Sequence, residues 1–176
     1  MTCQMPTIRT FRPEDSATVR RLFAAGQRDF SAGLEAEVEA YICLSLNADL
    51  SDIQRHYLAV NGSHFWVAES MLEVVGMVGV QRLSNEEAEL RRMSVASHAR
   101  RQGIEQRLLE TVEGHCLEEG FSRMVLSTVT QLQPAIAMYQ KAGFRLDREE
   151  PYGSMTVRYF VKDLNGPTAS PGGGQS

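Results

Sequence analysis

The chain has 176 residues, of which 43% are hydrophobic and 23% charged, and its formal net charge at pH 7 is −4. These values are typical of one globular domain with a sizeable core, and they exclude wholesale disorder. The negative charge argues against a general nucleic-acid-binding protein, which is usually basic.

The cysteines and the hydropathy favour a soluble, cytoplasmic protein. Cys3, Cys43 and Cys116 are widely spaced and odd in number, so they predict neither a disulfide framework nor a zinc site. The N-terminal segment lacks the pattern of a signal peptide. The most apolar run, residues 74–80, is far shorter than the roughly 20 residues of a membrane-spanning helix. We expect no metal, no nucleic-acid partner and no membrane span, and either a monomer or a homodimer.

Helical spacing of apolar residues dominates the first third of the chain. The expected elements there are, in chain order, a strand within residues 7–15, a helix through Val19, Leu22 and Phe23 capped by Asp15 or Ser16, a helix over residues 32–47, and a short helix within residues 49–60 begun by Ser51 or Asp52. Asn61 and Gly62 then indicate a turn.

The rest of the chain alternates strands and helices. The expected elements are a hairpin of residues 64–70 and 73–83, a strand at 89–96, a helix from Ile104 that stops at Gly120, a strand at 121–129, a helix from Pro134 to Ala142, and a terminal hairpin near 144–148 and 155–161. The Gly/Pro/Ser-rich residues 165–176 predict a disordered tail. This order predicts one α+β domain over residues 1–164, built around a single mixed sheet.

A loop with the sequence RRQGIEQ, residues 100–106, joins the strand at 89–96 to the helix that follows it. Backbone N–H groups at a helix N-terminus have no intrahelical acceptor and lie at the positive end of the helix dipole. Together with Gly103, which has no Cβ, such groups can wrap around a pyrophosphate. The loop matches neither a Walker loop nor a dinucleotide-binding fingerprint. An ordinary surface loop before a helix is the alternative.

Two motifs in this strand–helix setting resemble the GCN5-related N-acetyltransferases (the GNAT superfamily). Arg100–Glu105 is similar to the family's Q/R-x-x-G-x-G/A, and the segment from Ala135 through Tyr139 to Gly143–Phe144 is similar to A-x-x-x-Y-x-x-x-G-F. The stretches IRTFRPED and FWVAES…VVGMVGV fit as well, so the resemblance covers about residues 7–162. It implies an α/β/α-layered α+β fold with a mixed, mostly antiparallel sheet of about six or seven strands and about four flanking helices.

Within that superfamily, GSHFWVAES, RRQGI and AMYQKAGF look most like the vertebrate camello-like branch. The best-characterised members of the branch acetylate cysteine S-conjugates or protein lysines at internal membranes, and they carry a hydrophobic segment before the FWVAES strand. This chain has the amphipathic AYICLSLNADLSDIQRHY at that place. The departure does not support membrane association. It leaves the acceptor open among small-molecule amines, cysteine conjugates and protein lysines or N-termini.

The resemblance implies acetyl-CoA as co-substrate and an amine as acceptor. Backbone groups of Met93, Ser94 and Val95 would pair with the pantetheine arm as an added strand does. The pyrophosphate would be held by the loop, that is by Arg100, Arg101, Gln102, Gly103, Ile104, Glu105 and Gln106. Many relatives have a cofactor-contacting asparagine where this chain has Leu132, and Gln133 or Gln131 would substitute for it.

Two residues are candidates for the proton transfers of an acetyl transfer. In some members of the family a glutamate eleven residues before the loop removes the amine's proton, and that position is Glu89 here. Strand alternation would place Glu89 on the same face as Met93 and Val95. The alternative is a solvent-facing charge in an acidic cluster. Tyr139 matches a tyrosine that protonates the leaving thiolate, which suits a phenol of pKa near 10, and a packed helix tyrosine is its alternative.

Glu105 departs from the family's pattern, because a small residue is usual there. A carboxylate beside a phosphate weakens binding, although Arg100, Arg101 and Arg107 can offset it. This departure motivates a second function, a non-catalytic module that binds acyl-CoA or a protein partner. A loop for another nucleotide is a third.

The remaining candidates are weaker. His56, His64, His98 and His115 show no metal-ligand spacing, although His98 can reach the phosphates of a ligand in the loop. Cys116 and Trp66 are expected to be packing residues.

Overall fold

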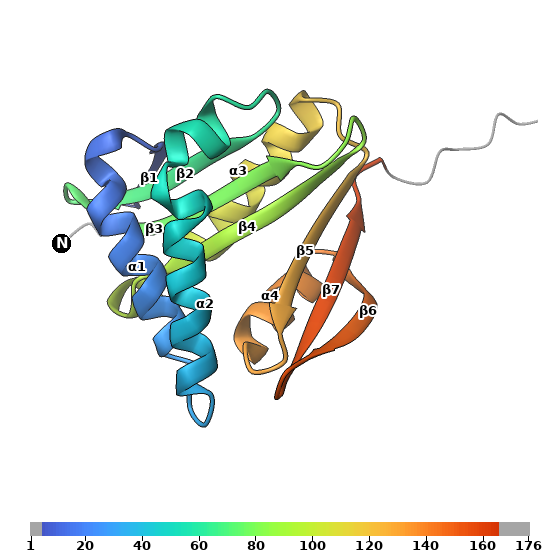
Figure 1. The fold of residues 1–176 in the computed structure, drawn as a ribbon. Coiled ribbons are helices and arrows are strands. Elements are labelled where there is room, and N and C mark those ends of the chain that lie inside the picture. Colours follow the sequence, from blue (N-terminus) through green and yellow to red (C-terminus); the bar gives the residue numbers. More distant parts are fainter. Residues whose placement is uncertain (1–4, 166–176) are drawn as a thin grey trace, which may run out of the picture.

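A seven-stranded sheet runs through the structure, a computed structural model that describes residues 5–165 (Figure 1). Its strands are β1 (Thr7–Thr10), β2 (His64–Ser70), β3 (Glu73–Arg82), β4 (Glu87–Val95), β5 (Arg123–Val129), β6 (Arg145–Tyr152) and β7 (Met155–Asp163). They lie in the order β1–β2–β3–β4–β5–β7–β6, and within residues 5–165 only β4 and β5 pair in parallel. The predicted α+β fold around one mixed, mostly antiparallel sheet is confirmed. Of the predicted tail, only Asn165 falls within the described residues.

Helices cover both faces of the sheet (Figure 1). They are α1 (Ser16–Arg28), α2 (Glu35–Asn47), α3 (Ile104–Glu118) and α4 (Gln133–Lys141). Because side chains alternate along a strand, Phe65 and Val67 of β2 join the core with α1 and α2, whereas Trp66 joins the core with α3 and α4. Trp66 and Cys116 are buried packing residues, as predicted. Burial raises the pKa of the Cys116 thiol to about 12.

The segment between α2 and β2 differs from the single short helix expected there. It forms a 3-10 turn, η2 (Asp49–Ser51), and a π-helical turn, η3 (Gln54–Leu58). Asp52 starts the second turn, since its carboxylate accepts the Arg55 N–H at 3.0 Å. Leu50 and Tyr57 are fully buried in the core with α1 and α2. Burying both favours this irregular path over one continuous helix.

Other boundaries shift by a few residues. α2 begins at Glu35, three residues after the predicted start, because the chain turns at Gly33 with φ +80°. Further 3-10 turns, η1 (Pro13–Asp15) and η4 (Ser97–Ala99), precede α1 and follow β4. Within residues 5–165, no helix combines the length and hydropathy that crossing a membrane requires.

Candidate active site

The short pairing of β4 with β5 leaves the sheet split. Only three residue pairs join the two strands, from Glu87–Arg123 to Glu89–Val125. From Leu90 onward β4 pairs only with β3, and from Leu126 onward β5 pairs only with β7. Figure 1 shows the two strands diverging from their paired ends. Both facing edges carry backbone N–H and C=O groups that can pair with an extended ligand.

A β-bulge in β4 lies beside this split. Gly79 pairs with Arg91 and Met77 pairs with Ser94, so Arg92 and Met93 together oppose a single residue of β3. Arg92 has φ +59°, a left-handed conformation that usually requires glycine at this place in a bulge.

The prediction that Glu89 shares a face with Met93 and Val95 is wrong, because the extra residue of the bulge reverses the alternation of β4. Met93 and Val95 pack into the core with α3 and α4, as Ala88 and Leu90 do. Glu89 therefore lies on the other face of the sheet. A base at Glu89 would reach a reacting amine from the side opposite to that core.

The loop before α3 presents a row of unpaired backbone donors. The N–H groups of residues 101–106 have no acceptor among residues 5–165, and the first bond of the helix runs from the Arg107 N–H to the Gly103 carbonyl at 3.1 Å. Gly103 has φ +77°, and a Cβ built there would have no atom within 4 Å, so the space in front of the loop is open. Such a row at the start of a 15-residue helix is an anion-binding arrangement.

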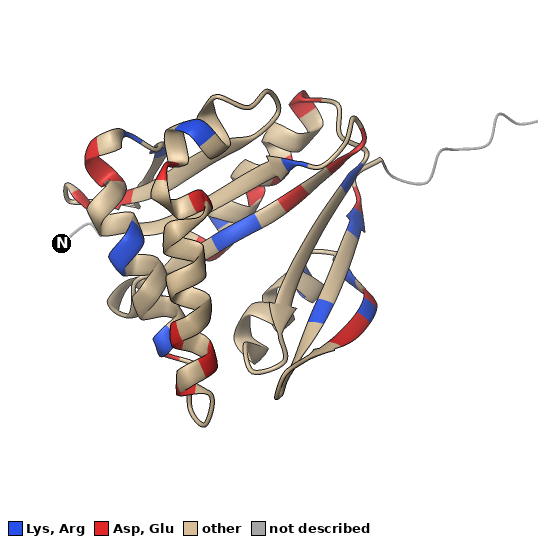
Figure 2. Cartoon of the chain, in the orientation of Figure 1, with Lys and Arg blue, Asp and Glu red and all other residues tan. Residues whose placement is uncertain are grey.

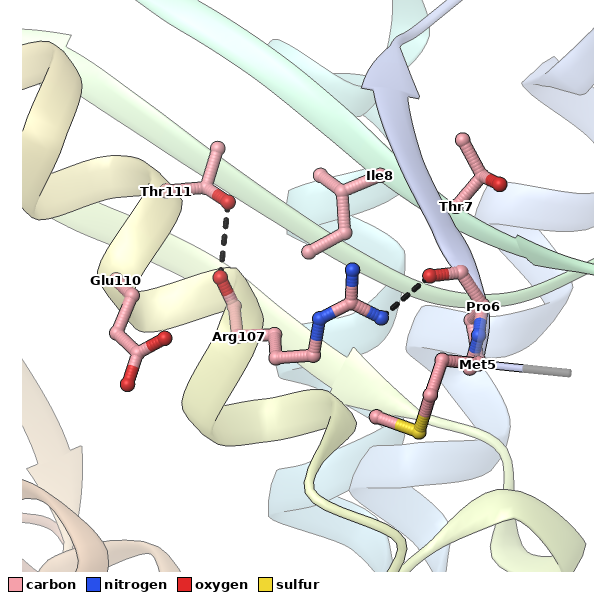
Figure 3. A pocket seen from close by; sticks show the side chains of 7 residues that line it. All are labelled: Met5, Pro6, Thr7, Ile8, Arg107, Glu110 and Thr111. Atoms are coloured by element: carbon pink, nitrogen blue, oxygen red, sulfur yellow. Dashed lines mark hydrogen bonds between the residues drawn. The ribbon is translucent and has the colours of Figure 1, made fainter. Parts of the chain in front are cut away.

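The arginines near this loop are less available than the sequence suggests. Arg100 donates to the Val95 carbonyl at 3.0 Å and to the Asp29 carboxylate at 2.6 Å. Arg107 points away from the loop and donates to the Pro6 carbonyl, as Figure 3 shows. Of the three arginines expected to offset Glu105, only Arg101 has no partner within residues 5–165. Glu105 has no hydrogen-bond or ion-pair partner there either.

Tyr139 lies on α4 in the core shared with α3. Its ring is 5% exposed and meets Phe144 edge-on, with ring centroids 5.9 Å apart. Burial raises the pKa of the phenol well above its ordinary value near 10. The hydroxyl has no hydrogen-bond partner among the described residues. Every fully buried side-chain N or O atom there has one, so this hydroxyl is not fully buried. The hydroxyl oxygen therefore keeps a small accessible surface, and its proton is not used by the described residues.

Glu89 stands where the split begins, at the last residue that β4 pairs with β5. Its side chain is 27% exposed and lies 3.7 Å from the Arg91 guanidinium. It lines a cavity of about 410 Å³, together with Val125, Tyr159 and Arg148 from β5, β7 and β6. Figure 2 shows acidic and basic residues following one another along β6, so the wall formed by that strand is charged but mixed in sign.

The remaining predicted site residues fall into supporting places. The Gln133 amide donates to the Thr130 carbonyl and so closes the turn before α4. His98 is 62% exposed beside the loop, 4.0 Å from Glu73. Within residues 5–165, no group of three or more His, Cys, Asp or Glu side chains is placed to hold a metal ion.

Known proteins resemble this chain in sequence and in fold. The model of the acetyltransferase (GNAT) family matches residues 30–144. The chain belongs to this family. The resemblance that the two motifs predicted is thereby confirmed.

Similar sequences include N-acetyltransferase 8 proteins and other members of family 8, which confirms the predicted likeness to the camello-like branch. The GNAT chain is 41% identical to human N-acetyltransferase 8 over 110 residues, which cover 60% of this chain and 48% of that protein. It is 36% identical to N-acetyltransferase family 8 member 3 of Mus musculus over 119 residues, 65% of this chain and 53% of that protein. The chain thus spans about half the length of these relatives.

Solved structures share the fold of this GNAT chain. A GNAT-family acetyltransferase from Staphylococcus aureus Mu50 aligns with a TM-score of 0.74 over 91% of this chain and 99% of that one, at 22% identity. The PaiA N-acetyltransferase of Thermoplasma acidophilum, solved in complex with coenzyme A, aligns with a TM-score of 0.75 over 89% and 98%, at 22% identity. At this identity the likeness shows the fold alone.

Sequence reasoning did not identify two residues beside the site, Arg92 and Asp49, which form a buried ion pair. A signal was present, because Arg91 and Arg92 interrupt a strand that packs on both faces. The pattern alone cannot reveal which of the two arginines turns inward, since that depends on the bulge.

Proposed function

We propose that the chain is an acetyl-CoA-dependent N-acetyltransferase that transfers the acetyl group directly to an amine. The observation that carries the proposal is one continuous arrangement, the open edge of β4 followed by the row of unpaired N–H groups at residues 101–106. An extended arm that ends in a pyrophosphate fits such an arrangement, because its amides can pair with a strand edge and its phosphates can accept the N–H groups.

The donor would lie along β4 with its pyrophosphate at the start of α3. Met93, Ser94 and Val95 supply the strand edge, and the loop supplies its backbone N–H groups. Arg101 adds a positive charge with no other partner within residues 5–165. The Glu105 carboxylate repels the phosphates. Its backbone N–H is nevertheless one of the donors, and its side chain is free to turn outward.

The transfer joins the amine nitrogen to the acetyl carbonyl carbon and breaks the bond between that carbon and sulfur. Glu89, at the start of the split, accepts the proton that the ammonium loses, directly or through a water molecule. Its partial exposure beside the cavity lets an acceptor approach from the face opposite to α3 and α4. Binding both reactants across one split makes the reaction effectively intramolecular.

Tyr139 supplies a hydrogen bond to the departing sulfur. Its raised pKa keeps the phenol protonated through the neutral range, and it makes the phenol a weaker acid than a thiol. We propose that the hydroxyl gives its proton to sulfur as the carbon–sulfur bond breaks and regains one from the amine nitrogen, which loses its second proton in the same step, so that neither a thiolate nor a phenolate is left in an apolar site.

A single assay tests the function. Acetyl-CoA is incubated with the chain and a panel of amines (polyamines, aminoglycosides, lysine peptides and cysteine S-conjugates), and the free thiol of released CoA is measured. We expect amine-dependent thiol release that saturates with acetyl-CoA. The absence of acetyl-CoA binding by calorimetry at millimolar concentration would refute the proposal.

A non-catalytic acyl-CoA-binding module is the second candidate, and Glu105 favours it. It predicts saturable binding of acetyl-CoA without thiol release for any amine. The two measurements together separate the candidates.

A further inference from the structure

Arg92 has an unusual setting for a charged residue in a sheet. Its side chain is 4% exposed and pairs with Asp49, whose side chain is 6% exposed. The guanidinium donates to both carboxylate oxygens of Asp49, at 2.9 and 2.5 Å, and to the hydroxyls of Ser45 and Tyr41, at 2.9 and 3.0 Å. Tyr57 also donates to Asp49. One arginine of β4 thus binds three residues spaced four apart along α2 and η2, which is the spacing of one helix face.

Stability alone does not account for this cluster. A buried ion pair loses the hydration of two charges, and well-packed apolar residues often serve as well or better. The same residue also has a φ of +59°, a backbone conformation that is unfavourable for a residue with a bulky side chain and easy for glycine. Two unfavourable features therefore coincide at the bulge that borders the split. Features of this kind concentrate at functional sites.

The cluster joins α2 to β4, and α2 in turn reaches the other side of the split. Ile42 and Ser45 of α2 are buried, and Val38 and Leu46 pack partly buried against the core, so polar contacts add to the apolar packing that holds this helix. Near its N-terminus, Glu37 accepts a hydrogen bond from Ser154, in the turn between β6 and β7, at 2.8 Å. α2 therefore spans from the bulge on the β4 side to the hairpin on the β7 side.

We propose that Arg92 and Asp49, with Ser45 and Tyr41, are positioning residues for acetyl transfer. The pair holds the bulge, and with it the backbone of Met93–Val95 on which the acetyl donor rests. It also fixes α2, which borders the side from which the amine enters. The cluster thereby sets the donor and the acceptor relative to each other. This inference rests on the proposed function.

The test compares variants of this pair with a matched buried pair remote from the split. Asp49→Asn and Arg92→Lys remove the bidentate ion pair. Asp15→Asn is the control, since Asp15 is similarly buried and bound by two nitrogens of Arg9, at 2.8 and 2.9 Å. The turnover number, the dissociation constant for CoA and the melting temperature are measured for each, with turnover measured well below the melting temperature.

We expect Asp49→Asn and Arg92→Lys to lower kcat about 100-fold, the size of effect that a misplacement of about 1 Å produces. The dissociation constant for CoA should rise by much less than kcat falls, because the loop at residues 101–106, which would hold the pyrophosphate, is untouched. Asp15→Asn should lose thermal stability and keep its kcat. If Tyr41→Phe, at the exposed rim of the cluster, also lowers kcat without lowering the melting temperature, a purely structural role is excluded.

An unchanged kcat in Asp49→Asn, or an equal loss in Asp15→Asn, would overturn the inference. Should Asp49→Asn fail to fold, Arg92→Lys and Tyr41→Phe carry the same comparison. If the wild-type chain binds acetyl-CoA but transfers nothing, the proposed function fails separately. Amide hydrogen exchange of residues 91–95 then tests whether the ion pair holds the bulge. The exchange rate must rise in Asp49→Asn and must not rise in Asp15→Asn.

Discussion

At the scale of single residues, we expect Glu105 to set how strongly the loop binds an anion. It stands among six unpaired N–H groups, and its carboxylate has no partner within residues 5–165. A charge about 4 Å from a phosphate costs roughly 1 kcal/mol in water-like surroundings, which is about fivefold in affinity. Glu105→Gln and Glu105→Gly should therefore tighten CoA binding about fivefold in calorimetry at low salt.

The control for Glu105 is Glu118→Gln, which removes the same charge from the same helix. At 1.5 Å per residue it lies roughly 20 Å from the loop. This is about twice the Debye length at 0.1 M salt, so its charge is largely screened from a ligand in the loop. It should leave the dissociation constant unchanged. If Glu105→Gln does the same, the carboxylate points away from the phosphates.

In the proposed mechanism, the chemical step depends most on Tyr139. Tyr139→Phe keeps the ring that packs on Phe144 and removes only the hydroxyl. We expect kcat to fall by about 100-fold, with CoA affinity and melting temperature nearly unchanged. Because burial raises the pKa of the phenol, its ionisation should impose no loss of activity below about pH 10. A wild-type rate in the phenylalanine variant would remove Tyr139 from the mechanism.

At the scale of elements, the stability that the Arg92–Asp49 ion pair gives to the contact between α2 and β4 should depend on pH. Burial would raise the pKa of Asp49, but hydrogen bonds from Arg92 and Tyr57 outweigh it, so the pKa is lowered. A carboxyl with a lowered folded-state pKa stabilises the fold above its unfolded pKa, near 3.9, and loses that contribution as pH falls.

The prediction concerns the difference in unfolding free energy between the wild type and Asp49→Asn. It should be largest near neutral pH, at about 3–5 kcal/mol, because removing one partner leaves the other buried and charged. It should narrow as the pH falls below about 4. Denaturant unfolding at several pH values measures it, and a difference independent of pH would contradict the role given to the pair.

Most elements could be predicted from the sequence, and the exceptions share a cause. Periodicity indicated the hairpin of β2 and β3, the helix α3 and its end at Gly120, because local residue preference and burial agree there. The bulge at Arg92 has no local signal, since arginine is a poor residue for φ +59°. Tertiary bonds to Asp49 and Ser45 hold it there, so the face of Glu89 was predicted wrongly. The irregular path through Asp49 and Tyr57 depends on the same bonds.

At the scale of the whole molecule, the split sheet explains why a chain of net charge −4 can hold a polyanion. The proposed site relies on backbone dipoles, strand edges and one arginine with no partner in the described part of the chain, so overall charge is a poor guide to it. The family assignment was predictable because two motifs occur in order. The hydrogen bonds of Arg100 and Arg107 were not predictable, because each of these arginines donates to a part of the chain that is remote in sequence.

Binding should also stabilise the whole fold, because the donor would bridge β4, α3 and α4. A ligand at 100 times its dissociation constant stabilises by about 2.7 kcal/mol, which raises the melting temperature of a domain this size by about 5–10 °C. Acetyl-CoA should produce this shift in a thermal scan. Pantetheine, which lacks the pyrophosphate, should produce a smaller one, and equal shifts would argue against the loop as the anchor.

The central claim is that the edge of β4 and the loop before α3 together bind acetyl-CoA. Amide hydrogen exchange with and without saturating acetyl-CoA tests it most directly, because the N–H groups of residues 101–106 have no acceptors among residues 5–165 in the free chain. We predict marked protection of residues 101–106 and of the β4 segment 90–95, with the far strand β1 unchanged. Saturable binding that leaves exchange at residues 101–106 unaltered would contradict the account.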